Sequence, residues 1–180
     1  MTFSLPLAVL AFLMTLATAT YSQDTGRYGC LPTAEVTPEI TPRELASATR
    51  ACVEKDDLRT AVQLYLTYSS FILFDQQRVR DETAQVVVGE LNNWIFTGYD
   101  YHRMQRLRVW INRLRDPQSE FLRQTCEAIQ AVGYPTYRPD YMIVRGLMPR
   151  KSDDDWITEG FDAEVAWDRA LHDINPCPRN

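Results

Sequence analysis

The sequence predicts an all-α fold, a single domain of five to six helices arranged as antiparallel helical hairpins and braced by disulfides. Three observations support this prediction. Apolar residues recur at the helical period through most of the chain. Prolines and capping residues stand where helices would begin and end. The length of 180 residues, with 45% apolar and 24% charged residues, is that of one ordinary globular domain.

The N-terminal residues predict an export signal. Residues 3–17 form an uncharged apolar run, FSLPLAVLAFLMTLA, which is shorter than the roughly 20 residues of a membrane span. The small-x-small pattern that ends at Ala19 predicts cleavage after that residue. Because no Lys or Arg precedes the run, an uncleaved N-terminal anchor is the alternative. The expected parts of the chain are a signal peptide at 1–19, an extended N-terminal arm at 20–42 and a helical domain at 43–180.

Helix signals place the elements of this domain in order. Thr41 is a candidate N-cap, with Pro42 at the first helical position and Glu44 at the third, so a helix should begin here. The segment 58–74 has apolar residues around most of its helical wheel, so its helix should lie at the centre of the core. The expected helices span about 43–54, 58–74, 75–96, 102–115, 118–132 and 162–174.

Residues 134–160 form a long loop rich in tyrosine and proline, with a candidate short strand at 142–144. Long loops in compact domains are often functional, and tyrosine and arginine are enriched at binding hot spots. The alternative is a loop that packs over the core. Tyr137→Ala with Tyr141→Ala should weaken partner binding in the first case and lower stability in the second. The candidate partner-binding residues are Tyr134, Tyr137, Asp140, Tyr141 and Arg145.

The four cysteines, at 30, 52, 126 and 177, predict disulfides, because an even count in an exported protein favours bridges over free thiols. Four cysteines allow three connectivities. Cys30–Cys52 with Cys126–Cys177 is favoured, since each bridge would pin a loose end of the chain to a nearby helix. No two cysteines have the close spacing of zinc ligands, so no metal or other cofactor is expected.

Other polar residues have an ordinary structural interpretation. His102 and His172 each lie near an aspartate, but their spacing gives no sign that they converge. The arginines of the predicted helix 102–115 flank its apolar stripe, two on each side, so we expect them to pair with some of the 24 acidic residues of the chain. These arginines are Arg106, Arg108, Arg113 and Arg115. The acidic run 153–155 lacks the alternating ligands and glycine of a calcium loop, which favours a solvated loop.

Packing residues recur along 43–74 at the positions of a helical hairpin repeat: Leu45, the turn 55–58, Ala61, Leu64 and Tyr65. On these residues the segment resembles a single tetratricopeptide or Sel1-like helical hairpin. The departures are Thr49, where a small residue is usual, and Cys52, where an aromatic residue is usual; no second copy follows at the same period. The resemblance implies an antiparallel helix pair. The pairs 74–75 and 78–79 and the later segment 139–143 (FD, RV and PDYMI) form a general layout. This layout is similar to small exported proteins of Gram-negative bacteria that have no settled function.

These features favour a protein-binding module over an enzyme. The net charge of −5 and a pI near 5.1 argue against a nucleic-acid partner. The familiar hydrolase, protease and nucleotide-binding motifs are absent from the sequence. The leading hypothesis is a periplasmic or secreted protein without an integral membrane segment that binds another protein of the cell envelope, in its sharpest form an inhibitor or immunity protein acting on an envelope enzyme. The alternatives are an envelope hydrolase with carboxylate catalysis, whose residues have no sequence signature, and a structural or assembly factor.

Overall fold

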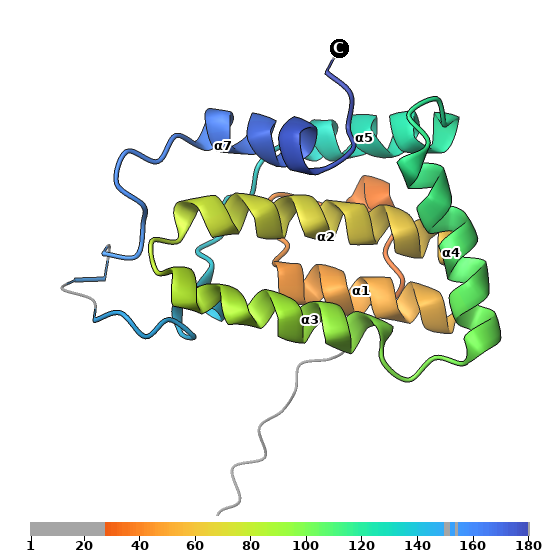
Figure 1. The fold of residues 1–180 in the computed structure, drawn as a ribbon, viewed down its shortest axis with the longest axis horizontal. Helices are drawn as coiled ribbons and strands as arrows, with labels where there is room; N and C mark the ends of the chain where they lie inside the picture. Colours follow the sequence, from red (N-terminus) through yellow and green to blue (C-terminus); the bar gives the residue numbers. More distant parts are fainter. Residues whose placement is uncertain (1–27, 150–151, 154, 180) are drawn as a thin grey trace, which may run out of the picture.

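A computed structural model describes residues 28–149, 152–153 and 155–179, so the predicted signal peptide lies outside the described residues. Within these ranges the chain forms seven α-helices and no strand, which confirms the all-α prediction (Figure 1). The helices are α1 (Pro42–Glu54), α2 (Leu58–Arg78), α3 (Val86–Phe96), α4 (Tyr101–Arg115), α5 (Glu120–Val132), α6 (Asp140–Ile143) and α7 (Ala163–Arg169). Two 3₁₀ turns, η1 (Thr33–Glu35) and η2 (Glu82–Gln85), and a π-helical turn, η3 (Ala170–Ile174), complete the secondary structure. None of the described helices is both long and apolar enough to cross a membrane.

Helix α2 lies at the centre of the molecule, as its apolar circumference predicts. It contacts α1, α4, α5 and α7, and Figure 1 shows it between the α1–α3 side and the α5–α7 side, with α4 crossing one end. The side chains of Leu64, Tyr68, Phe71 and Phe74 are at most 1% exposed. Burial of large side chains on all sides of one helix stabilises each by about 1.5–3 kcal/mol, so α2 organises the core.

Helix α1 begins with the predicted capping box. The Thr41 hydroxyl accepts a hydrogen bond from the Glu44 backbone N–H at 3.4 Å, and the Glu44 carboxylate accepts one from the Thr41 N–H at 2.8 Å. Pro42 occupies the first helical position, where it has no N–H to leave unpaired. These contacts satisfy two free backbone donors and fix the start of the α1–α2 hairpin.

The predicted third helix, 75–96, is wrong in its first part. Helix α2 continues to Arg78 and ends there, and α3 begins only at Val86. The cause is a contact with a distant segment: the Arg80 N–H donates to the Trp156 carbonyl at 2.8 Å, and the Thr158 N–H donates to the Arg78 carbonyl at 2.9 Å. This isolated bridge replaces the helical hydrogen bonds that would have continued α2.

The candidate strand at 142–144 is also wrong. Residues 140–143 form α6, a single helical turn that buries Tyr141, Met142 and Ile143 together. A strand would have sent alternate side chains to opposite faces, whereas the short helix places three consecutive side chains in the core. The loop 134–160 is therefore anchored to the domain at its middle.

Both predicted disulfides are present and use all four cysteines. Cys30–Cys52 ties the N-terminal segment to α1, and Cys126–Cys177 ties the C-terminal segment to α5. The segment 28–41 has no α-helix, and its apolar residues Leu31, Val36 and Ile40 are buried in the core. Both ends of the described chain are thus fixed by a bridge and by packing.

Candidate functional site

The aromatic loop encloses a buried carboxylate on α2. Asp75 is 0% exposed, and its Oδ2 accepts hydrogen bonds from the Tyr137 hydroxyl at 2.8 Å and the Tyr141 hydroxyl at 2.7 Å. Its Oδ1 accepts from Nε of Arg78, one turn further along α2, at 2.7 Å. The carboxylate therefore receives three hydrogen bonds, which is what a buried charge needs to be tolerated.

Aromatic rings cover the other side of this cluster. The Arg78 guanidinium lies 5.0 Å from the ring centres of Phe74 and Tyr137 and 5.8 Å from that of Trp156. The adjoining hollow, lined in part by Val79 and Trp156, has a volume of about 20 Å³, which is room for about one water molecule. A buried polar cluster thus joins α2 to the loop, and we call it the clasp. It consists of Asp75, Arg78, Tyr137 and Tyr141.

Burial controls the ionisation of these groups. Burial and the nearby charge of Asp75 raise the pKa of the Tyr137 and Tyr141 phenols well above the ordinary value of 10.0. Burial also raises the pKa of the Asp75 carboxyl, against the opposing effects of the Arg78 guanidinium and the two phenols. Both phenols therefore keep their protons and remain donors to Asp75 through the physiological pH range.

Stability should consequently fall in alkali. Above about pH 10 the unfolded phenols release protons that the folded phenols retain, so the free energy of unfolding decreases as the pH rises, by up to about 1.4 kcal/mol per pH unit for each phenol. Urea unfolding at several pH values above neutrality measures this slope. Tyr141→Phe should make the free energy of unfolding fall less steeply with pH, because one phenol no longer contributes. An unchanged slope in that variant would contradict the contribution of Tyr141.

The five predicted partner-binding residues separate into two groups. Tyr141 is buried and Tyr137 half-buried in the clasp, so the packing interpretation describes both tyrosines. Tyr134 is 39% exposed and its ring stacks on Phe74, while Asp140 and Arg145 are exposed. Asp140 forms an ion pair with Arg138 at 3.4 Å, and Arg145 forms one with Glu90.

The other candidate polar groups do not assemble into a site. His102 is exposed at the start of α4, while His172 lies beside the C-terminus with its Nδ1 3.0 Å from the Cys177 carbonyl. Of the acidic run, Asp155 pairs with Arg80. Across the described residues, no group of three or more His, Cys, Asp or Glu side chains is arranged to hold a metal ion.

A more distinctive surface lies on α4. This helix carries five arginines and no acidic residue, in a chain of net charge −5. Its inward face is anchored by Leu107 and Leu114, which are 1% and 7% exposed. In the part of the chain that the structure describes, only Arg106 among the five forms an ion pair, with Asp56. The helix arginines are Arg103, Arg106, Arg108, Arg113 and Arg115.

The expected pairing of these arginines with acids is therefore wrong for most of them. Arg103 lies over the ring of Tyr99 and Arg113 over that of Trp110. Arg108 and Arg115 are exposed and have no ion-pair partner among the described side chains. Cations in the last turn stabilise a helix by interacting with its dipole, which accounts for Arg115 structurally but not for Arg108 in the middle.

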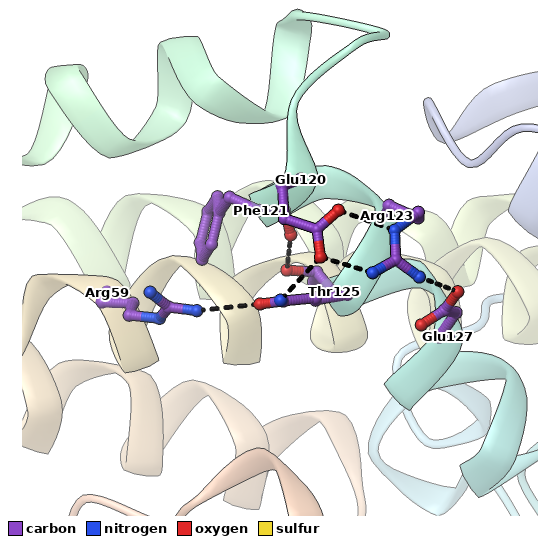
Figure 2. Close-up of polar contacts among 7 residues, drawn as sticks. Arg59, Glu120, Phe121, Arg123, Thr125 and Glu127 are labelled. Carbon is purple, nitrogen blue, oxygen red and sulfur yellow. Dashed lines mark hydrogen bonds and ion pairs between the residues drawn. The ribbon is translucent and has the colours of Figure 1, made fainter.

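Apart from Asp56, several acids near α4 form ion pairs or hydrogen bonds with groups other than the arginine side chains of α4. Figure 2 shows Arg123 on α5 between Glu120 and Glu127, with which it forms ion pairs. Arg59 of α2 donates a hydrogen bond to the Gln124 side chain at 3.1 Å. Its guanidinium also lies near the ring of Phe121 (Figure 2). The flanking aspartates of α4, at 100 and 116, accept hydrogen bonds from the backbone N–H groups of Arg103 and Gln118. Among the described side chains, Arg108 and Arg115 are therefore left without an ion-pair partner.

Two hollows lie along α4. The hollow toward the α1–α2 turn, about 410 Å³, holds both Asp56 and Arg106, so its charges compensate each other. The hollow toward the end of α3, about 450 Å³, is lined only by apolar, amide and cationic side chains. Its lining residues are Phe96, Met104, Arg108, Ile111, Asn112 and Arg115. We call this surface the α3–α4 hollow.

Sequence reasoning singled out the tyrosine loop and not α4. The signal was nevertheless present, because a run of fifteen residues with five arginines and no acid cannot form ion pairs within its own helix. Whether distant acids compensate such a run depends on the tertiary structure. No protein-family model, curated protein or solved structure matches this chain.

Proposed function

We propose that this chain is an exported protein-binding module that recognises an acidic partner protein of the cell envelope through α4. The observation that carries the proposal is the pair of exposed arginines, Arg108 and Arg115, which have no carboxylate partner among the described residues and border an apolar hollow of about 450 Å³. Arginine is enriched at binding hot spots, and a guanidinium binds a carboxylate through two parallel hydrogen bonds.

The rigidity of the surface supports the same proposal. Helix α4 is held against α2 and α5 by contacts that include Leu107 and Leu114. Two disulfides hold the ends of the domain to α1 and α5. A surface that is ordered before binding loses less conformational entropy when the partner docks. An inhibitor or immunity protein that neutralises an envelope enzyme is the sharpest form of this function.

Export is part of the proposal. The uncharged run at 3–17 and the Ala19 cleavage pattern are typical of a signal peptide. The two disulfides fit an oxidising compartment, the periplasm or the exterior. The mature chain would meet its partner there.

The test is charge reversal on α4. Arg108→Glu with Arg115→Glu should lower the yield of a stoichiometric cross-linked partner, captured by the mature protein from its own source cells, at least tenfold, because two attractive charges become repulsive. The matched control is Arg43→Glu with Arg169→Glu, which makes the same charge change at exposed positions on α1 and α7.

The two variants must remain folded for the comparison to hold, which thermal unfolding monitors directly. If both variants lose the partner equally, the net charge of the protein and not the α4 surface would explain the loss, and the proposal would be wrong. Undiminished capture by the α4 variant would overturn the proposal.

A further inference from the structure

We infer that the α3–α4 hollow binds an amphipathic helix of the partner, about three turns long, with aliphatic residues on one side and Asp or Glu beside them. This inference rests on the proposed function and adds the chemical form of the segment that is recognised. It follows from the shape of the hollow, the order of its lining residues and its charge.

The floor of the hollow is apolar. Phe96, Met104 and Ile111 are partly buried and pack against the core, yet each also lines the hollow. Their remaining exposed surface is removed from water only when another apolar group covers it. Burial of apolar area stabilises a complex by about 25 cal/mol per Å² before the costs of association, so aliphatic side chains are the groups that this floor favours.

The rim of the hollow is cationic. Arg108 and Arg115 lie seven residues apart on the same side of α4, with Asn112 between them. No acidic side chain lines this hollow, in contrast to the one that contains Asp56. Two carboxylates at a matching separation on the bound segment would each meet one guanidinium.

The lining residues follow one line along α4. Met104, Arg108, Ile111 and Arg115 stand at helical spacings of four, three and four, so they occupy one face. From Met104 to Arg115 the helix rises about 16 Å, or three turns. An amphipathic helix of the same length presents its own residues at i, i+3, i+4 and i+7 to such a groove.

Other ligands match fewer of these features. A bilayer requires a helix whose apolar face is free to insert, but the apolar stripe of α4, including Leu107 and Leu114, faces the core. A nucleic-acid backbone would use the two arginines and leave the aliphatic part of the floor uncovered. A sulfated or carboxylated polysaccharide would use the arginines and leave the apolar floor uncovered.

The closing experiment measures the affinity of the mature protein for two fluorescent peptides by anisotropy at physiological salt. The first is a stapled three-turn helix with Leu at i, i+3/i+4 and i+7 and Glu beside them. The second has the same length, staple and Glu positions, with Ser in place of Leu. We expect the Leu/Glu peptide to bind at least tenfold more tightly than the Ser/Glu peptide. Arg108→Glu with Arg115→Glu should weaken binding of the Leu/Glu peptide at least tenfold relative to the unchanged protein.

Two protein variants separate the floor from the rim. Met104→Gln, which keeps the side-chain length, should weaken the Leu/Glu peptide about tenfold, while Arg43→Glu with Arg169→Glu should change its affinity less than twofold. Equal affinity for both peptides would overturn the inference and leave only an electrostatic surface. The inference would also be wrong if neither peptide binds and the protein instead binds vesicles of anionic phospholipid through Arg108 and Arg115. That result would favour a membrane as the ligand.

The inference and the proposed function can fail separately. If neither peptide binds but capture of the native partner still depends on Arg108 and Arg115, the inference is wrong and the protein-binding function stands. If the peptides do not bind and capture is also indifferent to these arginines, both are wrong.

Discussion

Asp75→Ala should lower the free energy of unfolding by about 3–5 kcal/mol, the usual cost of removing one partner of a buried ion pair. The substitution leaves the Arg78 guanidinium buried without its carboxylate and removes the acceptor of the Tyr137 and Tyr141 hydroxyls. Domains of this size have total stabilities of about 5–15 kcal/mol. Urea unfolding followed by circular dichroism should therefore show a large shift of the midpoint.

Matched variants identify the source of the loss. Asp140→Ala removes an exposed carboxylate from the same loop, whose ion pair with Arg138 is open to solvent, so its cost should stay below about 1 kcal/mol. Tyr141→Phe removes one of the three hydrogen bonds to Asp75 and should cost about 1–2 kcal/mol. If Asp75→Ala were no more harmful than Asp140→Ala, the clasp would contribute nothing to stability.

Removal of the Cys126–Cys177 bridge should have the second large effect. The bridge closes a segment with a sequence separation of 51 residues, for which chain entropy gives a stabilisation of about 4 kcal/mol. It also holds the C-terminal segment, in which the Cys177 N–H donates to the Leu171 carbonyl at 3.3 Å. Cys126→Ala with Cys177→Ala should lower the thermal midpoint and expose the C-terminal residues to carboxypeptidase.

The other bridge supplies the comparison. Cys30–Cys52 has a sequence separation of 22 residues, and the same chain-entropy relation gives about 3 kcal/mol. Cys30→Ala with Cys52→Ala should therefore be the milder double variant in equilibrium unfolding. The reverse order would mean that native contacts of the N-terminal segment, and not loop closure, dominate the effect.

Local signals in the sequence were sufficient for most of the helices. The Thr41 capping box depends on residues three positions apart, and both of its hydrogen bonds form. The central position of α2 follows from apolar residues that surround the helix. The disulfide pairing was favoured by proximity along the chain, because each bridge joins a loose end to a nearby helix.

The rest of the fold depended on contacts between distant residues. The end of α2 at Arg78 depends on backbone hydrogen bonds with Trp156 and Thr158. No sequence pattern around Arg78 predicts these contacts. Burial of Tyr137 and Tyr141 depends on Asp75, more than 60 residues earlier. Residue type could not decide between a surface and a core role for these tyrosines, because a phenol suits both when a hydrogen-bond partner is present.

The α4 surface illustrates the same limit for function. The five arginines were visible in the sequence, but their pairing depended on where acids from other helices lie. Glu120 and Glu127 are close in sequence to α4, yet both pair with Arg123. The resulting excess of positive charge belongs to the tertiary structure, which is why the charge of the whole chain gave no indication of it.

The disulfide connectivity has a consequence for how the chain can be oxidised. The bridges join the first cysteine to the second and the third to the fourth, without overlap. If the chain meets an oxidant from its N-terminus onward, Cys30 and Cys52 can pair before any competing thiol is present. Cys126 then waits for Cys177, the only other thiol left. Oxidation in the order of emergence leads directly to the native bridges, with no need for an isomerase to correct them.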